Sequence, residues 1–136
     1  MALEISQRER EGITIVDLHG RIVMGPEVSS FRDTVVPLAS ESNSRLILNM
    51  ADVAYIDSTG LGALVYCASA ARKAAGTVKL LHMNPRNLEL LVTAKLETIF
   101  ENYIDEQDAV NSFFPDRAVR KFDILEFVRD QQANEP

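Results

Sequence analysis

Leu46-Ile-Leu-Asn-Met-Ala-Asp-Val-Ala-Tyr-Ile-Asp-Ser-Thr-Gly-Leu-Gly62 is the segment around which the rest of this 136-residue chain is arranged. It opens with an apolar run at 46–48, which predicts a buried strand. Polar residues follow and predict a loop, and a second short apolar patch covers 53–56. An Ala- and Leu-rich stretch begins after Gly60 and predicts a helix. The predicted layout is a strand, a loop, a polar cluster and the start of a helix.

The polar cluster Asp57-Ser58-Thr59-Gly60 lies where this helix is expected to begin. The start of a helix combines unpaired backbone N–H groups with the positive end of the helix dipole. A hydroxyl at such a place can carry a phosphate, and Ser58 is the hydroxyl that we identify. Asp and Ser are also preferred helix N-caps, so a purely structural role is the alternative. Thr59 is a second acceptor hydroxyl, and it ranks below Ser58.

The hexapeptide 57–62, after a Leu-Ile-Leu-Asn strand, resembles the phosphorylation loop of STAS-domain proteins, the anti-sigma factor antagonists. The resemblance extends over residues 3–114 and includes the segment 95–100. In that family the serine directly after the aspartate is phosphorylated by a partner kinase, and only the unphosphorylated form binds the partner. The resemblance therefore implies phosphorylation at Ser58. It also implies two partners, an anti-sigma factor that is a serine kinase and a phosphatase that restores binding.

The resemblance further implies a partner-binding surface around this loop. Its expected members are Met24, Asp52, Asp57, Ser58, Thr59, Gly60, Leu61 and Gly62. The two glycines would let a partner approach the backbone closely, or they would only allow tight packing of the turn. The segment 20–26, which flanks the phosphorylation site in such folds, departs from the family pattern. That pattern commonly has an acidic residue after the first glycine, so the partner's identity stays open.

A phosphate at Ser58 would add about −1.5 to −2 charges at neutral pH. Helix-dipole effects are worth about 0.3–1 kcal/mol, against a native stability of about 5–15 kcal/mol. Phosphorylation is therefore expected to leave the fold intact and to change the surface. Inside an interface, the same charge without a matching cation could cost several kcal/mol, which is enough to abolish binding.

The remaining segments predict a layered α/β domain with a mixed sheet of four to five strands and about four helices. A hairpin is expected at the start, because strands at 3–8 and 13–18 flank a Glu-Gly turn. Pro26 begins a helix, and Gly76 is expected to cap the end of the helix after Gly60. A strand is expected at 78–81, followed by a helix that begins at Asn84-Pro85. A short strand spanning Ile99, Phe100 and Tyr103 comes next. The last helix of the domain is expected to be capped by Asp105 and to bury Phe113 and Phe114.

Residues 1–114 are expected to form the STAS domain, and 115–136 a C-terminal helical extension. Val119, Phe122, Leu125 and Val128 recur every third residue, with Ile124 and Phe127 nearby, and predict an amphipathic helix from 116 to about 132. This helix would either pack on its own domain or serve for docking or dimerisation, so a homodimer is an open possibility. The helix after Gly62 raises a similar choice. Its second apolar face, which includes Tyr66 and Cys67, would lie under another element or form partner surface.

Composition excludes several classes of function. The net charge is −6 without a basic patch, which argues against nucleic-acid binding. No apolar run reaches the roughly 18 residues of a membrane span, and the first residues lack signal-peptide features. The single cysteine fits a reducing compartment. We therefore expect a cytoplasmic protein.

No catalytic, metal or cofactor site is expected. Asp52 and Asp57 could form a paired-carboxylate or Mg²⁺ site, but nothing in the sequence completes one. The two histidines lack companions at metal-ligand spacing. Two alternatives to an antagonist remain within the STAS resemblance, namely a scaffold subunit of a signalling assembly or of a lipid-transport system. A receiver domain phosphorylated on aspartate would require paired acids after the first strand and a late lysine, and neither is placed accordingly.

Overall fold

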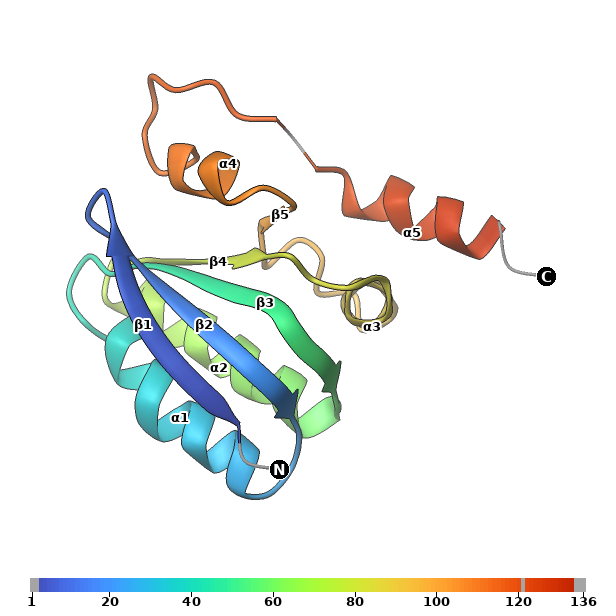
Figure 1. The fold of residues 1–136 in the computed structure, drawn as a ribbon, viewed down its shortest axis with the longest axis horizontal. Helices are drawn as coiled ribbons and strands as arrows, with labels where there is room; N and C mark the ends of the chain where they lie inside the picture. The colour runs from blue at the N-terminus through green and yellow to red at the C-terminus, as the bar shows by residue number, and fades with distance from the viewer. Residues whose placement is uncertain (1–2, 121, 134–136) are drawn as a thin grey trace.

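The computed structural model describes residues 3–120 and 122–133, and in them one five-stranded sheet has the order β1-β2-β3-β4-β5 (Figure 1). The strands are β1 (Glu4–Arg10), β2 (Ile13–Ile22), β3 (Arg45–Ile56), β4 (Thr77–Leu81) and β5 (Asn102–Tyr103). The first two pair antiparallel, and every later pair is parallel. The expected mixed sheet with an initial hairpin is confirmed.

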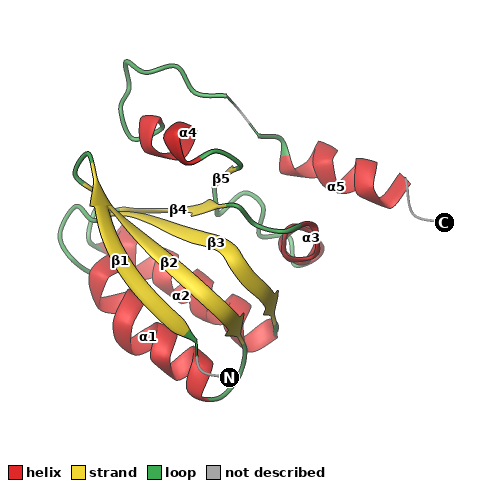
Figure 2. Ribbon diagram, viewed as in Figure 1, coloured by secondary structure: helices red, strands yellow, loops and turns green. Residues whose placement is uncertain are grey.

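The helices divide between the two faces of this sheet (Figure 2). α1 (Pro26–Ala39) and α2 (Ser58–Lys73) lie side by side on one face, as right-handed crossovers between adjacent parallel strands require. α4 (Glu106–Asn111) covers part of the opposite face near β4 and β5. α3 (Pro85–Thr93) contacts β3 and packs against α5 (Ile124–Ala133). The expected set of about four helices plus a C-terminal helix is confirmed.

Two hydrophobic clusters hold these layers together. The larger lies between the sheet and α1 and α2, where it contains Phe31, Leu48 and Leu64, and it extends to α3 and α5. The smaller lies on the opposite face, where Ile47 contributes to a cluster closed by α4. Residues 46–48 are all buried because β3 is covered on both faces, which confirms the predicted buried strand.

β3 corrects one prediction, because it continues without a loop to Ile56. The polar Asn49 was expected to end the strand. Its side-chain amide instead donates to Asp17 on β2 at 2.7 Å, so its polarity is satisfied within the sheet. Pairing with β2 continues to the Ile22–Ile56 pair with two irregularities in register. A polar partner on the neighbouring strand thus replaces the predicted loop.

The bounds of α2 also differ from the prediction. The helix begins at Ser58, before Gly60, and its C-cap is Ala74. Ala75 has the left-handed conformation (φ 59°) that was expected of Gly76. Gly76 is needed for a different reason, because a Cβ there would lie 2.0 Å from the Ser44 hydroxyl. The turn is therefore tight against the segment before β3.

The last part of the domain is less regular than predicted. β5 comprises only Asn102–Tyr103, so Ile99 and Phe100 lie before the strand. Asp105 caps α4 as expected, by accepting the N–H of Asp108 at 2.9 Å. α4 ends at Asn111, however, and Phe113 and Phe114 pack on the smaller cluster from beyond the helix.

α5 is shorter than predicted and turned differently. It begins after Asp123, whose carboxylate accepts the N–H of Glu126 at 3.1 Å. Ile124 and Val128 are buried and belong to the larger cluster, whereas Leu125 is 37% exposed. Phe122 and Phe127 also pack on that cluster, so the predicted stripe is wrong at Leu125, whose place is taken by Ile124, four residues before Val128. The helix packs on its own domain. The end of the predicted extension, 134–136, lies outside the described residues.

Candidate functional site

Asp57 is the N-cap of α2 and both of its carboxylate oxygens are occupied. Oδ1 accepts the backbone N–H of Gly60 at 2.7 Å, and Oδ2 accepts that of Met24 at 2.9 Å. These N–H donors, first Met24 and then Gly60, stabilise the ionised carboxylate and hold the pKa of Asp57 below its usual value. The side chain thereby joins the start of α2 to the segment between β2 and α1.

Ser58 is the first residue of α2 and is exposed. In the described part of the chain, no hydrogen bond involves its hydroxyl, because Asp57 already provides the cap. The alternative in which Ser58 serves as the helix cap is therefore wrong. Thr59 is also exposed. Both hydroxyls lie beside the positive end of a 16-residue helix.

The two glycines of this loop have different roles. A Cβ on Gly60 would lie 1.9 Å from the carbonyl oxygen of Ile22, so Gly60 lets the end of β2 touch the helix. A Cβ on Gly62 would meet no atom within 4 Å. Tight packing therefore accounts for Gly60 alone. Gly62 leaves an open place on the exposed side of α2, one turn beyond Ser58.

The predicted partner-binding residues are only partly brought together. Met24 is 72% exposed beside the Asp57 carboxylate, while Leu61 is buried in the larger cluster. Asp52 lies in a separate hollow on the sheet, where its carboxylate is 3.8 Å from the imidazole of His19. Because Asp52 and Asp57 line different hollows, they do not form the paired-carboxylate site that was considered.

A hollow of about 330 Å³ opens beside Ser58, between the end of β3, the start of α2 and α3. Asp57 and Ser58 line one part of it, and Arg86 on α3 lines another. The Arg86 guanidinium lies over the Tyr55 ring, 4.6 Å from its centroid. This places a cation and a phosphorylatable hydroxyl on the same hollow.

Two asparagines fix α3 in this position. The side-chain amides of Asn84 and Asn87 donate to the carbonyl oxygen of Val53, at 3.2 and 3.1 Å. Asn84 also caps α3, because its side-chain oxygen accepts the N–H of Asn87 at 2.8 Å. Sequence reasoning predicted this cap but missed Arg86 and Tyr55. Their proximity depends on how α3 lies against β3, for which the sequence offers no local signal.

The second apolar face of α2 is divided between core and surface. Ala63 and Cys67 are buried in the larger cluster, and burial raises the pKa of the Cys67 thiol to about 12. Tyr66 is exposed, and the Arg32 guanidinium of α1 lies 5.2 Å from its ring centroid. Tyr66 is two turns beyond Ser58, and together with Gly62 these residues form one exposed stripe.

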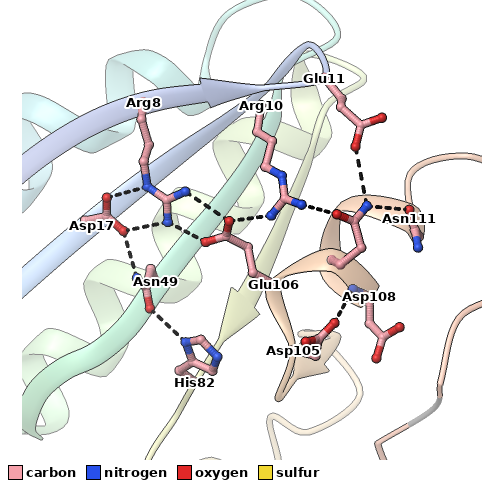
Figure 3. A network of polar contacts seen from close by, with 11 residues as sticks. Arg8, Arg10, Glu11, Asp17, Asn49, His82, Asp105, Glu106, Asp108 and Asn111 are labelled. Atoms are coloured by element: carbon pink, nitrogen blue, oxygen red, sulfur yellow. Dashed lines mark hydrogen bonds and ion pairs between the residues drawn. The ribbon is translucent and has the colours of Figure 1, made fainter.

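A polar network lies on the opposite side of the sheet from α1 and α2 (Figure 3). Arg8 on β1 donates to Asp17 at 2.7 Å and to Glu106 of α4 at 3.0 Å. These contacts hold the pKa values of both carboxylates below their usual range. His82 completes the chain of contacts through Asn49. The network joins the hairpin to α4 and is part of the scaffold.

Residues 3–120 and 122–133 offer neither a metal site nor a membrane-spanning helix. They contain no group of three or more His, Cys, Asp or Glu side chains placed to hold a metal ion. Within the same ranges, none of the helices has the length and apolar character needed to cross a membrane.

The chain was compared with known proteins. The family model of the STAS domain matches residues 4–109. An anti-sigma-B factor antagonist of Bacillus subtilis is 31% identical over 102 residues, which cover 74% of this chain and 91% of that protein. One of Staphylococcus epidermidis is 33% identical over 75 residues, covering 54% of this chain but only 60% of the relative. Among solved structures, the Bacillus cell fate determinant SpoIIAA in the phosphorylated form shares the fold, with a TM-score of 0.60 and 16% identity. The match covers 81% of this chain and 99% of SpoIIAA.

Proposed function

This chain belongs to the STAS domain family, and we propose that it is an anti-sigma factor antagonist. Two relatives that are about one-third identical over their matched residues carry that description. An antagonist acts by occupying an anti-sigma factor, so the proposed activity is protein binding and not enzymatic turnover. A sigma factor would be released as the result, which would place the protein in the cytoplasm.

The observation that carries the proposal is the spare hydroxyl of Ser58. Asp57 caps α2, so the fold does not need the Ser58 side chain, which is exposed beside the Met24 segment. We propose that the unphosphorylated serine lies within the interface with the anti-sigma factor. Phosphorylation by that partner, acting as a serine kinase, would end the binding, and a phosphatase would restore it. Thr59 is the secondary candidate.

The electrostatics of the hollow support a switch that acts on the surface. A phosphate on Ser58 would bring about −1.5 to −2 charges to the start of α2. The helix dipole and Arg86 favour that charge, while Asp57 opposes it. The repulsion is moderated because two N–H donors already bind the Asp57 carboxylate. The fold should therefore tolerate the phosphate, whereas an unmatched double charge at an interface could cost several kcal/mol.

The exposed part of the proposed interface comprises Met24, Ser58, Thr59 and Gly62, and the stripe continues to Tyr66. Gly60 and Leu61 would not contact the partner but would hold this surface in position, through close packing against Ile22 and through the larger cluster. Asp57 would act by holding the Met24 segment. Asp52 would belong only to the edge of a larger interface, because it lines a different hollow.

Co-purification from native cell extract tests the proposal. The bait proteins are the unmodified chain, Ser58→Ala, Ser58→Asp and the matched control Ser42→Asp, which places the same charge on an exposed residue of the loop before β3, next to the far end of α2. We expect a kinase-like partner with the unmodified chain, Ser58→Ala and Ser42→Asp, and its loss with Ser58→Asp. Circular dichroism should show equal folding of all four.

Recovery of the same partners by Ser58→Asp and Ser58→Ala would contradict the switch. The chain would then be assigned to a permanent assembly, as in the scaffold alternative. Whether the chain forms a homodimer is a separate question, which size-exclusion chromatography of the purified chain answers.

A further inference from the structure

A second hollow, of about 500 Å³, lies away from Ser58 between the β5 region and the C-terminal extension. Phe100 and Tyr103 belong to its domain side. Phe114, Val119 and Phe122 line it from the segment that follows α4. Its volume is typical of sites for small molecules, and its aromatic walls stand beside polar and charged side chains such as Glu97, Asn102 and Arg117.

Several hydrogen-bond donors in this wall already have protein acceptors. The Arg117 guanidinium donates to Glu11 at 2.8 Å and to Asn111 at 3.1 Å, which uses two of its five N–H groups. The Tyr103 hydroxyl donates to Glu101 at 2.6 Å. The Ser112 hydroxyl donates to the carbonyl oxygen of Ala109 at 2.6 Å. Both hydroxyl donors of the wall are therefore occupied.

Two acceptors of the same wall are not in use. Glu97 Oε2 and Asn102 Oδ1 are shielded from solvent, and neither has a hydrogen-bond partner among the described residues. Within the described part of the chain, every other buried side-chain nitrogen or oxygen atom has a hydrogen-bond partner. Both Glu97 and Asn102 line this hollow. Asn102 is only 8% exposed. A buried acceptor without a donor is unfavourable, and a carboxylate oxygen especially so.

We propose that this hollow binds a small organic cation with a flat apolar body, such as an arylamidinium or arylammonium compound. The cation would donate to Glu97 and Asn102 after a small rotation of their side chains, and its ring would lie among the aromatic walls. The Arg117 guanidinium already lies 4.0 Å from the Phe114 ring centroid, and the Lys79 ammonium lies 5.7 Å from that of Tyr103. The preference for positive charge therefore comes from two carboxylates of the wall, Glu97 and Glu101, against the one guanidinium of Arg117. The family model ends at residue 109, so part of this site is built by the chain beyond it.

Three probes of nearly equal shape test the proposed preference: benzamidine, which is a cation, benzamide, which is neutral, and benzoate, which is an anion. Each is titrated into the full chain while amide NMR spectra are recorded. We expect saturable binding of benzamidine in the millimolar range, weaker binding of benzamide and none of benzoate. The shifted signals should come from residues near 97–103 and 114–124. Equal binding of benzoate, or no saturable benzamidine binding, overturns the proposal.

Variants locate the site. Glu97→Gln removes the charge of this side chain and keeps its shape. It should weaken benzamidine binding about tenfold, because the cation loses a hydrogen bond to a charged acceptor. Val119→Trp should also weaken binding by filling the hollow. The control Glu89→Gln removes a carboxylate from the hollow beside Ser58 and should change nothing. Thermal unfolding verifies that each variant is folded. Unchanged affinity in both Glu97→Gln and Val119→Trp places the probe elsewhere and contradicts the assignment.

Discussion

The Asp57 carboxylate accepts the backbone N–H of Met24, 33 residues earlier in the chain, at 2.9 Å. The same side chain caps α2 through Gly60. One residue therefore sets both the start of the helix that presents Ser58 and the position of the exposed Met24 segment. These two hydrogen bonds give Asp57 a structural role, and its direct contact with a partner stays a prediction.

Replacing Asp57 with Ala should lower the free energy of unfolding by about 1 kcal/mol, the typical cost of losing an N-cap. Urea unfolding at neutral pH measures the change. Asp52→Ala is the matched control, because that carboxylate is exposed and lies outside the cap, and its effect should stay within about 0.5 kcal/mol. Equal losses in the two variants would show that the cap is not what stabilises this junction.

The two glycines of the loop should respond in opposite directions to alanine. Gly60→Ala places a methyl group 1.9 Å from the Ile22 carbonyl oxygen and must displace β2 or α2, so we expect marked destabilisation. Gly62→Ala meets open space within a helix and should stabilise the protein by up to about 1 kcal/mol.

The same Gly62→Ala variant should bind the anti-sigma partner less well, because the added methyl group projects from the proposed interface. Paired measurements of unfolding and partner affinity therefore separate packing from binding. A Gly62→Ala protein that is more stable and binds normally would remove Gly62 from the proposed surface.

Arg86 should act on the phosphorylated state. A guanidinium beside a phosphate favours the doubly ionised form and lowers the second phosphate pKa from its usual value of about 6. Phosphorus NMR of the chain carrying phosphoserine at 58 should therefore give a lower pKa in the unmodified sequence than in Arg86→Gln. The control Arg72→Gln, near the far end of α2, should leave the phosphate pKa unchanged. Coincident titration curves for all three would show that Arg86 does not reach the phosphate.

The Arg8 network should make stability depend on pH in a defined direction. The folded pKa values of Asp17 and Glu106 are lowered, chiefly by hydrogen bonds from Arg8. Their contribution to stability is therefore present above the unfolded pKa values of about 4 and is lost as the pH falls through the folded values.

Arg8→Met should accordingly lower the free energy of unfolding by about 0.5–1 kcal/mol near pH 7, a modest amount because the ion pairs are partly exposed. The difference from the unmodified protein should vanish near about pH 2, where the carboxylates are protonated. Urea unfolding at both pH values measures it, with Arg21→Met, an exposed arginine of β2, as the control. A difference that persists in acid would point to lost packing of the Arg8 stem.

The sequence predicted the elements that local patterns define. The strand at 46–48, the turn after β1 and the caps Asn84 and Asp105 are all found, because each depends on residues within a few positions of one another. The place of Ser58 at the start of α2 follows from the same kind of local pattern, while its phosphorylation stays a prediction. The sequence did not show that Asp57 caps the helix and leaves the Ser58 hydroxyl unused. Asp and Ser are equally suitable N-caps, and only the geometry distinguishes them.

The features that sequence reasoning missed depend on contacts between distant segments. Asn49 looked like the end of a strand until its partner on β2, Asp17, was known. Arg86 and Tyr55 come together only because α3 is fixed to β3. Asp52 lies apart from the rest of the predicted partner surface for a related reason. It is five positions before Asp57, but the strand continues between them and carries the two side chains to different hollows.

The C-terminal helix offers a direct comparison between its buried and exposed sides. Val128 is 2% exposed and Leu125 is 37% exposed, although both lay on the predicted stripe. Val128→Ala should lower the free energy of unfolding by about 2 kcal/mol through lost burial, since alanine itself favours the helix. Leu125→Ala should change it by no more than about 0.5 kcal/mol. Urea unfolding at several protein concentrations measures both. If Leu125→Ala were the more damaging and its effect grew with concentration, α5 would be an interface between two copies of the chain.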